Sequence, residues 1–329
     1  MHPLELTSES LQKALDLTSR FVREEIDSLE EQPSANLEGA ENLARTFVEP
    51  VPETPSSLEA ILERLRPAIR KSFNTAGPGY LAFIPGGGIM SAALAEFIAA
   101  SVNRYVGVRS PAPALAQIEE TAVAWLAQIM GYPRTAGGIL TSGGSLSTLS
   151  AIVAARESKL QDLSTGTLYL SEETHYCVSK AARIAGFREG QVRRVGVDDR
   201  RRMDVRALTQ AIEADRMKGL KPFMIIANVG TTNTGAIDDI PRLLSVARSH
   251  SMWVHADAAY GGFFRLARAG PRLMPEIEEC DSITLDPHKG MFLPYGTGCL
   301  LVRDPENLKR AHSMDAEYLH DVRAHESPN

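Results

Sequence analysis

The residues with the clearest chemical potential lie in the run Asp286-Pro287-His288-Lys289-Gly290, where a histidine and a lysine are adjacent between two apolar segments. A single lysine in a loop is most often a solvated surface charge. A lysine whose ammonium group is partly desolvated, however, releases its proton more easily and can form a Schiff base with an aldehyde. The apolar residues on both sides of Lys289 favour this second interpretation.

A Schiff-base lysine that works with pyridoxal phosphate (PLP) requires an acid for the pyridine nitrogen, a phosphate cradle and a group that lies on the ring. Asp257 is the candidate acid, because it ends the β-rich run 252–257 and would lie at the carboxyl edge of a parallel sheet. Two alternatives stay open: Asp257 caps the next turn, or it shares a metal ion with His255, which alternation places on the same face. No third ligand of metal-site spacing lies nearby in the sequence, so we predict no metal site.

A candidate phosphate cradle lies upstream, in the run Thr141-Ser142-Gly143-Gly144-Ser145. This run follows a short apolar segment and precedes a helix-forming stretch, a geometry in which free backbone N–H groups and the helix dipole hold an anion. Gly144 allows close approach of the backbone to a phosphate, and Ser145 adds a hydroxyl. The alternative is an ordinary strand-to-helix turn with a serine N-cap. The run lacks the Gly-Lys-Ser/Thr ending of a P-loop, and the chain has no GxGxxG fingerprint.

Two further residues fit the remaining demands of a PLP site. His175 follows the strand-like run 167–171, and an imidazole can lie flat on a pyridine ring and reach a substrate carboxylate. The alternative for His175 is a simple loop residue. Thr231 lies in a Gly-Thr turn after a buried strand-like run, where we expect a hydroxyl or backbone contact with the cofactor; its alternative is a plain turn.

Taken together and in order, the segments that carry these residues resemble one known family. The chain is similar to the PLP-dependent amino-acid decarboxylases of the aromatic-amino-acid and glutamate decarboxylase family, often called group II. The resemblance extends over roughly residues 76–303, because the blocks GYLAFIPGGGIMSAALAEFIAASVNRYVG and IEETAVAWLAQIMGYP match as well. The other matching segments are TSGGSLSTLSAIVAAR, SEETHYCVSKAA, NVGTTNTGAIDDI, WVHADAAYGG and DSITLDPHKG.

The resemblance implies a PLP cofactor, an amino-acid substrate and a role for each matching residue. Lys289 would form the Schiff base, Asp257 would pair with the pyridinium nitrogen, and His175 would stack on the ring. One departure from the family is Asp286, where many relatives have asparagine; a carboxylate near a phosphate is unfavourable unless it points away. Gly144, Ser145 and His288 would bind the phosphate, Thr231 and Ala259 would line the cofactor, and Tyr80, Phe83 and Pro85 would help to form the substrate pocket.

The reaction that the resemblance implies is the decarboxylation of an L-amino acid to the amine and CO2 through the Lys289 Schiff base. Family members continue into a catalytic loop and a small C-terminal domain, so residues 304–329 would be the start of a truncated C-terminal region. Two alternatives stay open: a PLP-binding protein with little turnover that acts through dimerisation, and another PLP reaction, such as aldol cleavage or transamination. Aromatic and acidic amino acids both remain candidate substrates.

Apolar strand-like runs alternate with helical segments from about residue 76 onward. This alternation predicts an α/β fold with a mostly parallel, seven-stranded sheet and helices on both faces, and the resemblance implies fold type I, the PLP-dependent transferase-like fold. Amphipathic helices predict an N-terminal helical segment, residues 1–75, before the PLP-binding large domain, residues 76–303. The expected strands are 138–141, 167–171, 192–197, 223–228, 252–257, 282–286 and 298–302.

Composition argues against several other classes of protein. With 329 residues, of which 43% are hydrophobic, the chain can bury a large core, and no stretch approaches the length of a transmembrane helix. The 35 basic and 41 acidic residues give a net charge of −6 without a basic block, so we expect no nucleic-acid partner. Three unpatterned cysteines and the lack of a signal-peptide pattern favour the cytoplasm. The resemblance implies a homodimer, because the N-terminal helices of the family pack on a partner subunit.

Overall fold

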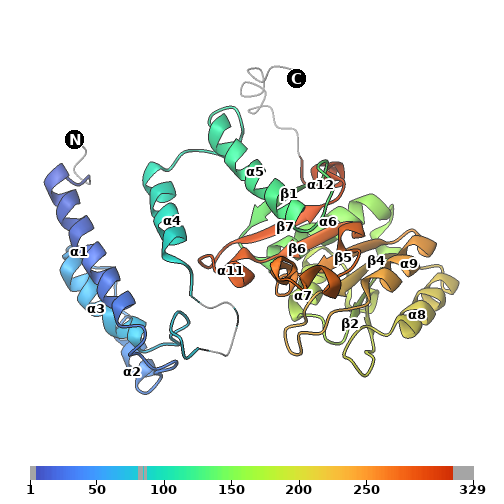
Figure 1. Ribbon diagram of the computed structural model, residues 1–329, viewed down its shortest axis with the longest axis horizontal. Coiled ribbons are helices and arrows are strands. Elements are labelled where there is room, and N and C mark those ends of the chain that lie inside the picture. The colour runs from blue at the N-terminus through green and yellow to red at the C-terminus, as the bar shows by residue number, and fades with distance from the viewer. Residues whose placement is uncertain (1–4, 81–83, 85–86, 314–329) are drawn as a thin grey trace. The chain divides into compact units, whose positions relative to one another are not determined.

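The computed structural model describes residues 5–80, 84 and 87–313 (Figure 1). The chain divides into two compact units, Met1–Gly87 and Gly88–Asn329. The predicted domain boundaries at residues 75 and 303 stay predictions. Within the described ranges, no helix is both long and apolar enough to cross a membrane.

The first unit is built from helices, as the amphipathic pattern predicts. The helices α1 and α3 pack together, and each begins at a hydroxyl side chain, Thr7 or Ser57, that accepts a hydrogen bond from the first turn. Arg66 of α3 joins the pair, because its guanidinium lies 2.6 Å from Glu24 and over the ring of Phe21. The helices of this unit are α1 (Ser8–Asp27), α2 (Ala40–Arg45) and α3 (Leu58–Arg70).

The second unit contains a seven-stranded sheet, and every strand lies on one of the predicted apolar runs. The strand order is β1-β7-β6-β5-β4-β2-β3. The strands β6, β5, β4, β2 and β3 are parallel to one another. In contrast, β7 is antiparallel to both β6 and β1. The prediction of a mostly parallel α/β sheet is confirmed. The strands are β1 (Gly137–Thr141), β2 (Gly166–Ser171), β3 (Val192–Val195), β4 (Lys221–Asn228), β5 (Trp253–Asp257), β6 (Ser282–Leu285) and β7 (Gly298–Val302).

Helices cover both faces of this sheet, as predicted (Figure 1). Alternating side chains of the strands form two separate cores. In β4, Ile225 and Ala227 pack with residues of α8 and α9, whereas Met224 and Ile226 pack with residues of α6 and α7. A strand that is covered on both faces is therefore apolar throughout. The helices of this unit are α4 (Met90–Val102), α5 (Pro113–Ile129), α6 (Gly144–Lys159), α7 (Tyr176–Ile184), α8 (Val205–Met217), α9 (Ile240–His250), α10 (Gly270–Leu273), α11 (Pro287–Gly290) and α12 (Pro305–His312).

Six of the seven strands end at the same edge of the sheet, and five of them, β1, β2, β4, β5 and β6, lead to residues of the candidate site. Because β7 runs opposite to both neighbours, β1 points in the same direction as β6 and the parallel strands β5, β4 and β2. The ends of these five strands, or the segments that follow them, carry one residue each of the set Gly144, His175, Thr231, Asp257 and Asp286. The carboxyl edge of an open α/β sheet is where ligands bind.

Candidate functional site

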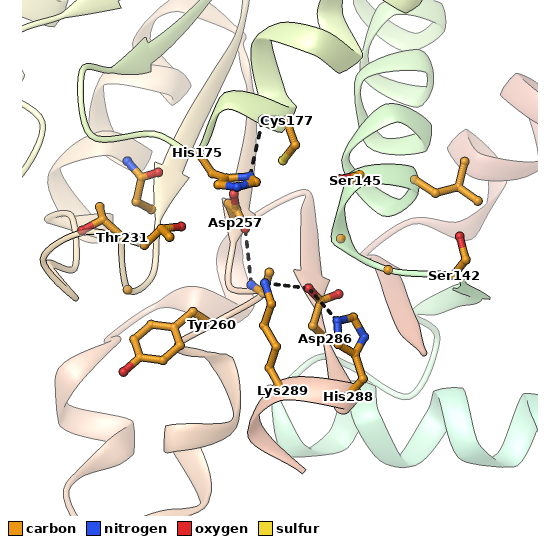
Figure 2. A pocket seen from close by; sticks show the side chains of 17 residues that line it. Ser142, Ser145, His175, Cys177, Thr231, Asp257, Tyr260, Asp286, His288 and Lys289 are labelled. Carbon is orange, nitrogen blue, oxygen red and sulfur yellow. Dashed lines mark hydrogen bonds and ion pairs between the residues drawn. The ribbon is translucent and has the colours of Figure 1, made fainter. Parts of the chain in front are cut away.

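A cavity of about 360 Å³ lies at this carboxyl edge, a size that suits a small molecule (Figure 2). The loops after all five strands contribute to its wall. The structure therefore brings together every residue predicted to bind the cofactor. These residues are Gly144, Ser145, His175, Thr231, Asp257, Ala259, His288 and Lys289.

The predicted phosphate cradle is the N-terminus of α6. Gly143 precedes this helix with φ of +146°, a conformation that residues with side chains rarely adopt. No side chain caps the helix, so the first N–H groups are available to an anion in the cavity. The alternative of a serine N-cap is wrong, since the N-cap is Gly143. A Cβ at Gly144 would lie 3.0 Å from Asp286 and 3.3 Å from Ala259, so a larger residue would crowd the cradle.

Asp257 ends β5 with its carboxylate at the cavity (Figure 2). Its Oδ1 accepts a hydrogen bond from the Ala259 N–H at 3.3 Å. Burial raises the pKa of the Asp257 carboxyl, and the Ala259 hydrogen bond and the positive charge of Lys289 only partly offset this effect. A cation placed against Asp257 would favour its charged form, and a protonated pyridine nitrogen is such a cation.

His175 is the N-cap of α7, which fixes the position of its imidazole. Nδ1 accepts a hydrogen bond from the Cys177 N–H at 3.4 Å, so the proton of the neutral ring is on Nε2. Partial burial lowers the pKa of His175, although the negative charge of Asp257 opposes this effect. A neutral, flat ring therefore borders the cavity, which suits stacking on another ring.

Thr231 lies on the loop after β4, and its hydroxyl is 2.6 Å from that of Thr234. A buried polar network holds the base of this loop. The Asn228 side-chain nitrogen donates to Ser171 Oγ at 3.0 Å and to Asp238 Oδ2 at 2.9 Å. These bonds tie the end of β4 to the end of β2, so the two loops that follow are placed together.

Lys289 lies in the short helix α11, and its amine reaches the cavity (Figure 2). The Nζ atom is 2.9 Å from Asp286 Oδ2, and the lysine side chain is 25% exposed. The His288 Nδ1–H donates to the Thr297 carbonyl, and His288 Nε2 lies 3.9 Å from the same Asp286 oxygen. Lys289 is thus partly shielded from water, and its carboxylate partner is a contact that the sequence argument missed.

Several further cavity residues were not predicted, among them Cys177, Asn228 and Tyr260. Burial raises the pKa of the Cys177 thiol to about 12, so the thiol stays neutral. A usable signal existed for two of them: Cys177 is two residues after His175, and Tyr260 follows Ala259 directly. Residues next to a predicted site residue at a helix start or in a tight turn can therefore border the same cavity.

The substrate-pocket residues are described only in part. Tyr80 lies in the first unit, where its ring centroid is 6.2 Å from that of Phe73. Phe83 and Pro85 lie outside the described residues. The predicted substrate pocket therefore stays a prediction.

The alternative of a metal shared by His255 and Asp257 finds no support in the geometry. Both ring nitrogens of His255 are engaged, by Ser282 Oγ at 2.8 Å and by Thr284 Oγ1 at 3.1 Å. His255 is fully buried and does not border the cavity. Over the residues that the structure describes, no group of three or more histidine, cysteine or carboxylate side chains could hold a metal ion.

Comparison with solved structures defines the class of this protein. The fold matches that of Oryza sativa TDC in complex with PLP and tryptamine, with a TM-score of 0.90 and 26% identity, over 99% of this chain and 71% of the other. The seven-stranded sheet and its helices are thus those of the PLP-dependent fold type I class, as predicted.

Within that class, residues 41–327 match the family described as pyridoxal-dependent decarboxylase conserved domain, and the chain belongs to this family. Aromatic-L-amino-acid decarboxylase of Bacillus atrophaeus is 33% identical over 320 residues, which cover 97% of this chain and 67% of the relative. Cysteine sulfinic acid decarboxylase of Rattus norvegicus is 33% identical over 272 residues, covering 80% of this chain and 55% of the relative. The predicted family resemblance is confirmed, and the chain spans between 55% and 67% of the length of these relatives.

Proposed function

We propose that this chain binds PLP at the carboxyl edge of its sheet and uses it to decarboxylate an L-amino acid to the amine and CO2. The observation that carries the proposal is that the Lys289 amine enters the same cavity as the Asp257 carboxylate and the uncapped N-terminus of α6. PLP has an aldehyde, a ring nitrogen and a phosphate, and each of these groups finds a partner of suitable chemistry there. The family match and the PLP in Oryza sativa TDC support the same reading.

Each residue around the cavity would hold a different part of the cofactor. The N–H groups at Gly144 and Ser145 would bind the phosphate, because a helix N-terminus favours an anion. Lys289 would hold the aldehyde carbon covalently, Asp257 would pair with the ring nitrogen, and His175 would lie against the ring. Further contacts would come from His288, Thr231 and Ala259.

When bound, PLP supplies a protonated ring that accepts the electron pair released as the bond from Cα to the carboxylate breaks. The chain's own residues set the conditions for this. The buried Asp257 carboxylate favours a proton on the ring nitrogen. The neutral imidazole of His175 adds no charge above the ring, and the loops after five strands line the cavity around the Lys289 amine.

The first test is whether the chain takes up PLP through Lys289. Purified chain mixed with PLP should show the visible absorbance of lysine-bound PLP, and Lys289→Ala should abolish it because no other amine borders the cavity within the described residues. Borohydride reduction followed by mass spectrometry should place the added mass on Lys289. Lys180→Ala, which removes an exposed lysine, should keep the band. A parent chain without the band would contradict the cofactor proposal.

The second test is turnover. Amine and CO2 release should be measured with the PLP-loaded chain and a panel of aromatic and acidic amino acids, since relatives of both kinds match this chain. Full PLP occupancy with no amine and no CO2 would favour the alternative of a PLP-binding protein that acts through dimerisation. A product other than the amine would favour aldol cleavage or transamination.

We further propose that the chain forms a homodimer in the cytoplasm. The helix α4 buries none of its residues, and its Phe97 and Ile98 are 55% and 62% exposed. Trp125 of α5 is 65% exposed. Large exposed apolar side chains of this kind favour an interface with another protein surface. All three cysteines are free and buried, which suits a reducing compartment.

A further inference from the structure

Asp286 lies between the lysine amine and the phosphate cradle. The residue follows β6 and is only 2% exposed. Its Oδ2 is 2.9 Å from Lys289 Nζ, while its Oδ1 has no hydrogen-bond partner among the residues that the structure describes. The side chain does not cap α11, although it stands at the N-cap position. An unpartnered buried carboxylate oxygen is costly, so this one calls for an explanation within the site.

The carboxylate faces the cradle rather than pointing away from it. A Cβ built on Gly144 would lie 3.0 Å from Asp286 Oδ2 and 3.2 Å from Oδ1, so both oxygens border the first residue of α6. The N–H groups of that residue and its neighbour are the proposed phosphate anchor. A phosphate held there would bring its negative charge close to that of Asp286, and like charges at short range oppose each other strongly in a partly buried site.

The other charged groups around Asp286 do not offset the combined negative charge of its carboxylate and a phosphate. Lys289 is the one cation joined to it by a close ion pair in the described structure, and His288 Nε2 is 3.9 Å away. From the other elements the site is bordered by Asp257 of β5, whose pKa is raised by burial and, to a smaller extent, by the Asp286 charge. His175 at the start of α7 is held neutral by burial, so it adds no positive charge.

We propose that Asp286 is a positioning residue that limits the affinity of this site for PLP. This inference rests on the proposed function and goes beyond it. Its carboxylate opposes the phosphate, and its contact with the Lys289 amine at 2.9 Å competes with the approach of that amine to the aldehyde carbon. The amine must lose one proton to solvent before its lone pair can bond to the aldehyde carbon; the aldehyde oxygen then leaves as water with the remaining two amine protons.

The test compares the parent chain with Asp286→Asn, which keeps the shape of the side chain and removes its charge. The amide oxygen can still face Lys289, and the N–H2 group can donate to a phosphate held in the cradle. Titrations followed by the visible absorbance should give a dissociation constant for PLP that is lower by on the order of tenfold. The affinity for pyridoxal, which lacks the phosphate, should increase less.

Three controls keep the outcomes separate. Asp286→Ser also removes the charge, circular dichroism checks that both variants are folded, and Asp199→Asn removes an exposed carboxylate and should change nothing. Unchanged or weaker PLP binding by both folded variants would overturn the inference, while lysine-bound PLP in the parent would leave the proposed function standing. An equal increase in affinity for PLP and for pyridoxal would contradict the proposal that Asp286 opposes the phosphate. No PLP band in any of the proteins would overturn both proposals.

Discussion

At the scale of the residue, the charge of the Asp257 carboxyl depends in part on groups that are distant in sequence. Burial raises the pKa of Asp257, and the positive charge of Lys289, 32 positions later in the chain, lowers it in part. The Lys289 amine in turn lies beside Asp286. A cation that a ligand places against Asp257 therefore favours the charged form of this carboxyl.

On the proposed function, Asp257→Asn should leave PLP attached to Lys289 but slow decarboxylation. An amide cannot hold the ring nitrogen in its protonated form, so the ring accepts electrons less readily. Loss of one such preorganised electrostatic contact lowers turnover by on the order of 10²-fold or more. Amine release at saturating substrate measures the effect, and the visible absorbance reports occupancy. Turnover equal to that of the parent would contradict the role of Asp257.

At the scale of the element, the strands β5 and β6 are joined by buried polar contacts as well as by their backbone ladder. His255 of β5 lies between Ser282 and Thr284 of β6, and the Trp253 ring N–H donates to the same Ser282 hydroxyl at 2.8 Å. These bonds satisfy polar groups that cannot reach water. The two strands that carry Asp257 and lead to Asp286 are thereby held in a fixed relation.

This arrangement predicts a pH dependence of stability. Burial lowers the pKa of His255 to about 3, whereas an unfolded chain has a histidine pKa of about 6.5. Below that value the unfolded chain takes up a proton that the folded chain refuses, so the stabilising contribution is complete above pH 6.5 and is lost as the pH falls toward 3. Between pH 7 and 4.5 the parent should lose about 2 to 3 kcal/mol more of its unfolding free energy than His255→Gln.

Urea unfolding at the two pH values measures this difference. The comparison uses the change with pH within each protein, because His255→Gln also alters packing. His312→Gln replaces an exposed histidine and should show the pH profile of the parent. Parallel profiles for the parent and His255→Gln would show that His255 is not held neutral in the fold.

The elements themselves were largely predictable, but their directions were not. Each of the seven apolar runs forms a strand of one sheet. Their side chains are buried because helices cover both faces of this sheet. That β7 runs antiparallel to β1 and β6 was not visible in its sequence, since a buried strand is apolar in either direction. The direction of β7 is set by the way in which the chain between α11 and α12 turns back along β6.

At the scale of the whole molecule, the exposed apolar helix α4 is the feature that a single chain leaves unexplained. On the proposed homodimer, Phe97→Glu should reduce the mass in solution to that of one chain, because a charge at a buried apolar interface is unfavourable. Size-exclusion chromatography with light scattering measures the mass. Glu96→Gln, on the same helix, should leave the dimer intact. A parent chain that elutes as a monomer at all concentrations would contradict the dimer.

Residues of the candidate site were predictable where a side chain of suitable chemistry stands in a recognisable local pattern. Lys289, Asp257, His175 and the glycine turn could be found because an amine, an acid, a flat ring and an anion cradle each have a recognisable local pattern. Cys177, Tyr260 and Asn228 have no such pattern of their own. Cys177 and Tyr260 lie beside predicted residues in the sequence, but the cavity was needed to show that all three border the site. Asp286 was noticed as a departure, but its contacts with Lys289 and the cradle needed the structure.

By itself the sequence determined the class of fold, the family and the candidate groups for a PLP site, because strand and helix periodicity and short motifs are local properties of the chain. Tertiary structure alone decided which of these groups meet. It used both ring nitrogens of His255 within the sheet, it left the N-terminus of α6 open, and it placed Asp286 against Lys289 and Gly144. The contacts of His255 and the approach of Asp286 to Gly144 depend on the packing of strands far apart in the chain, and no local pattern records them.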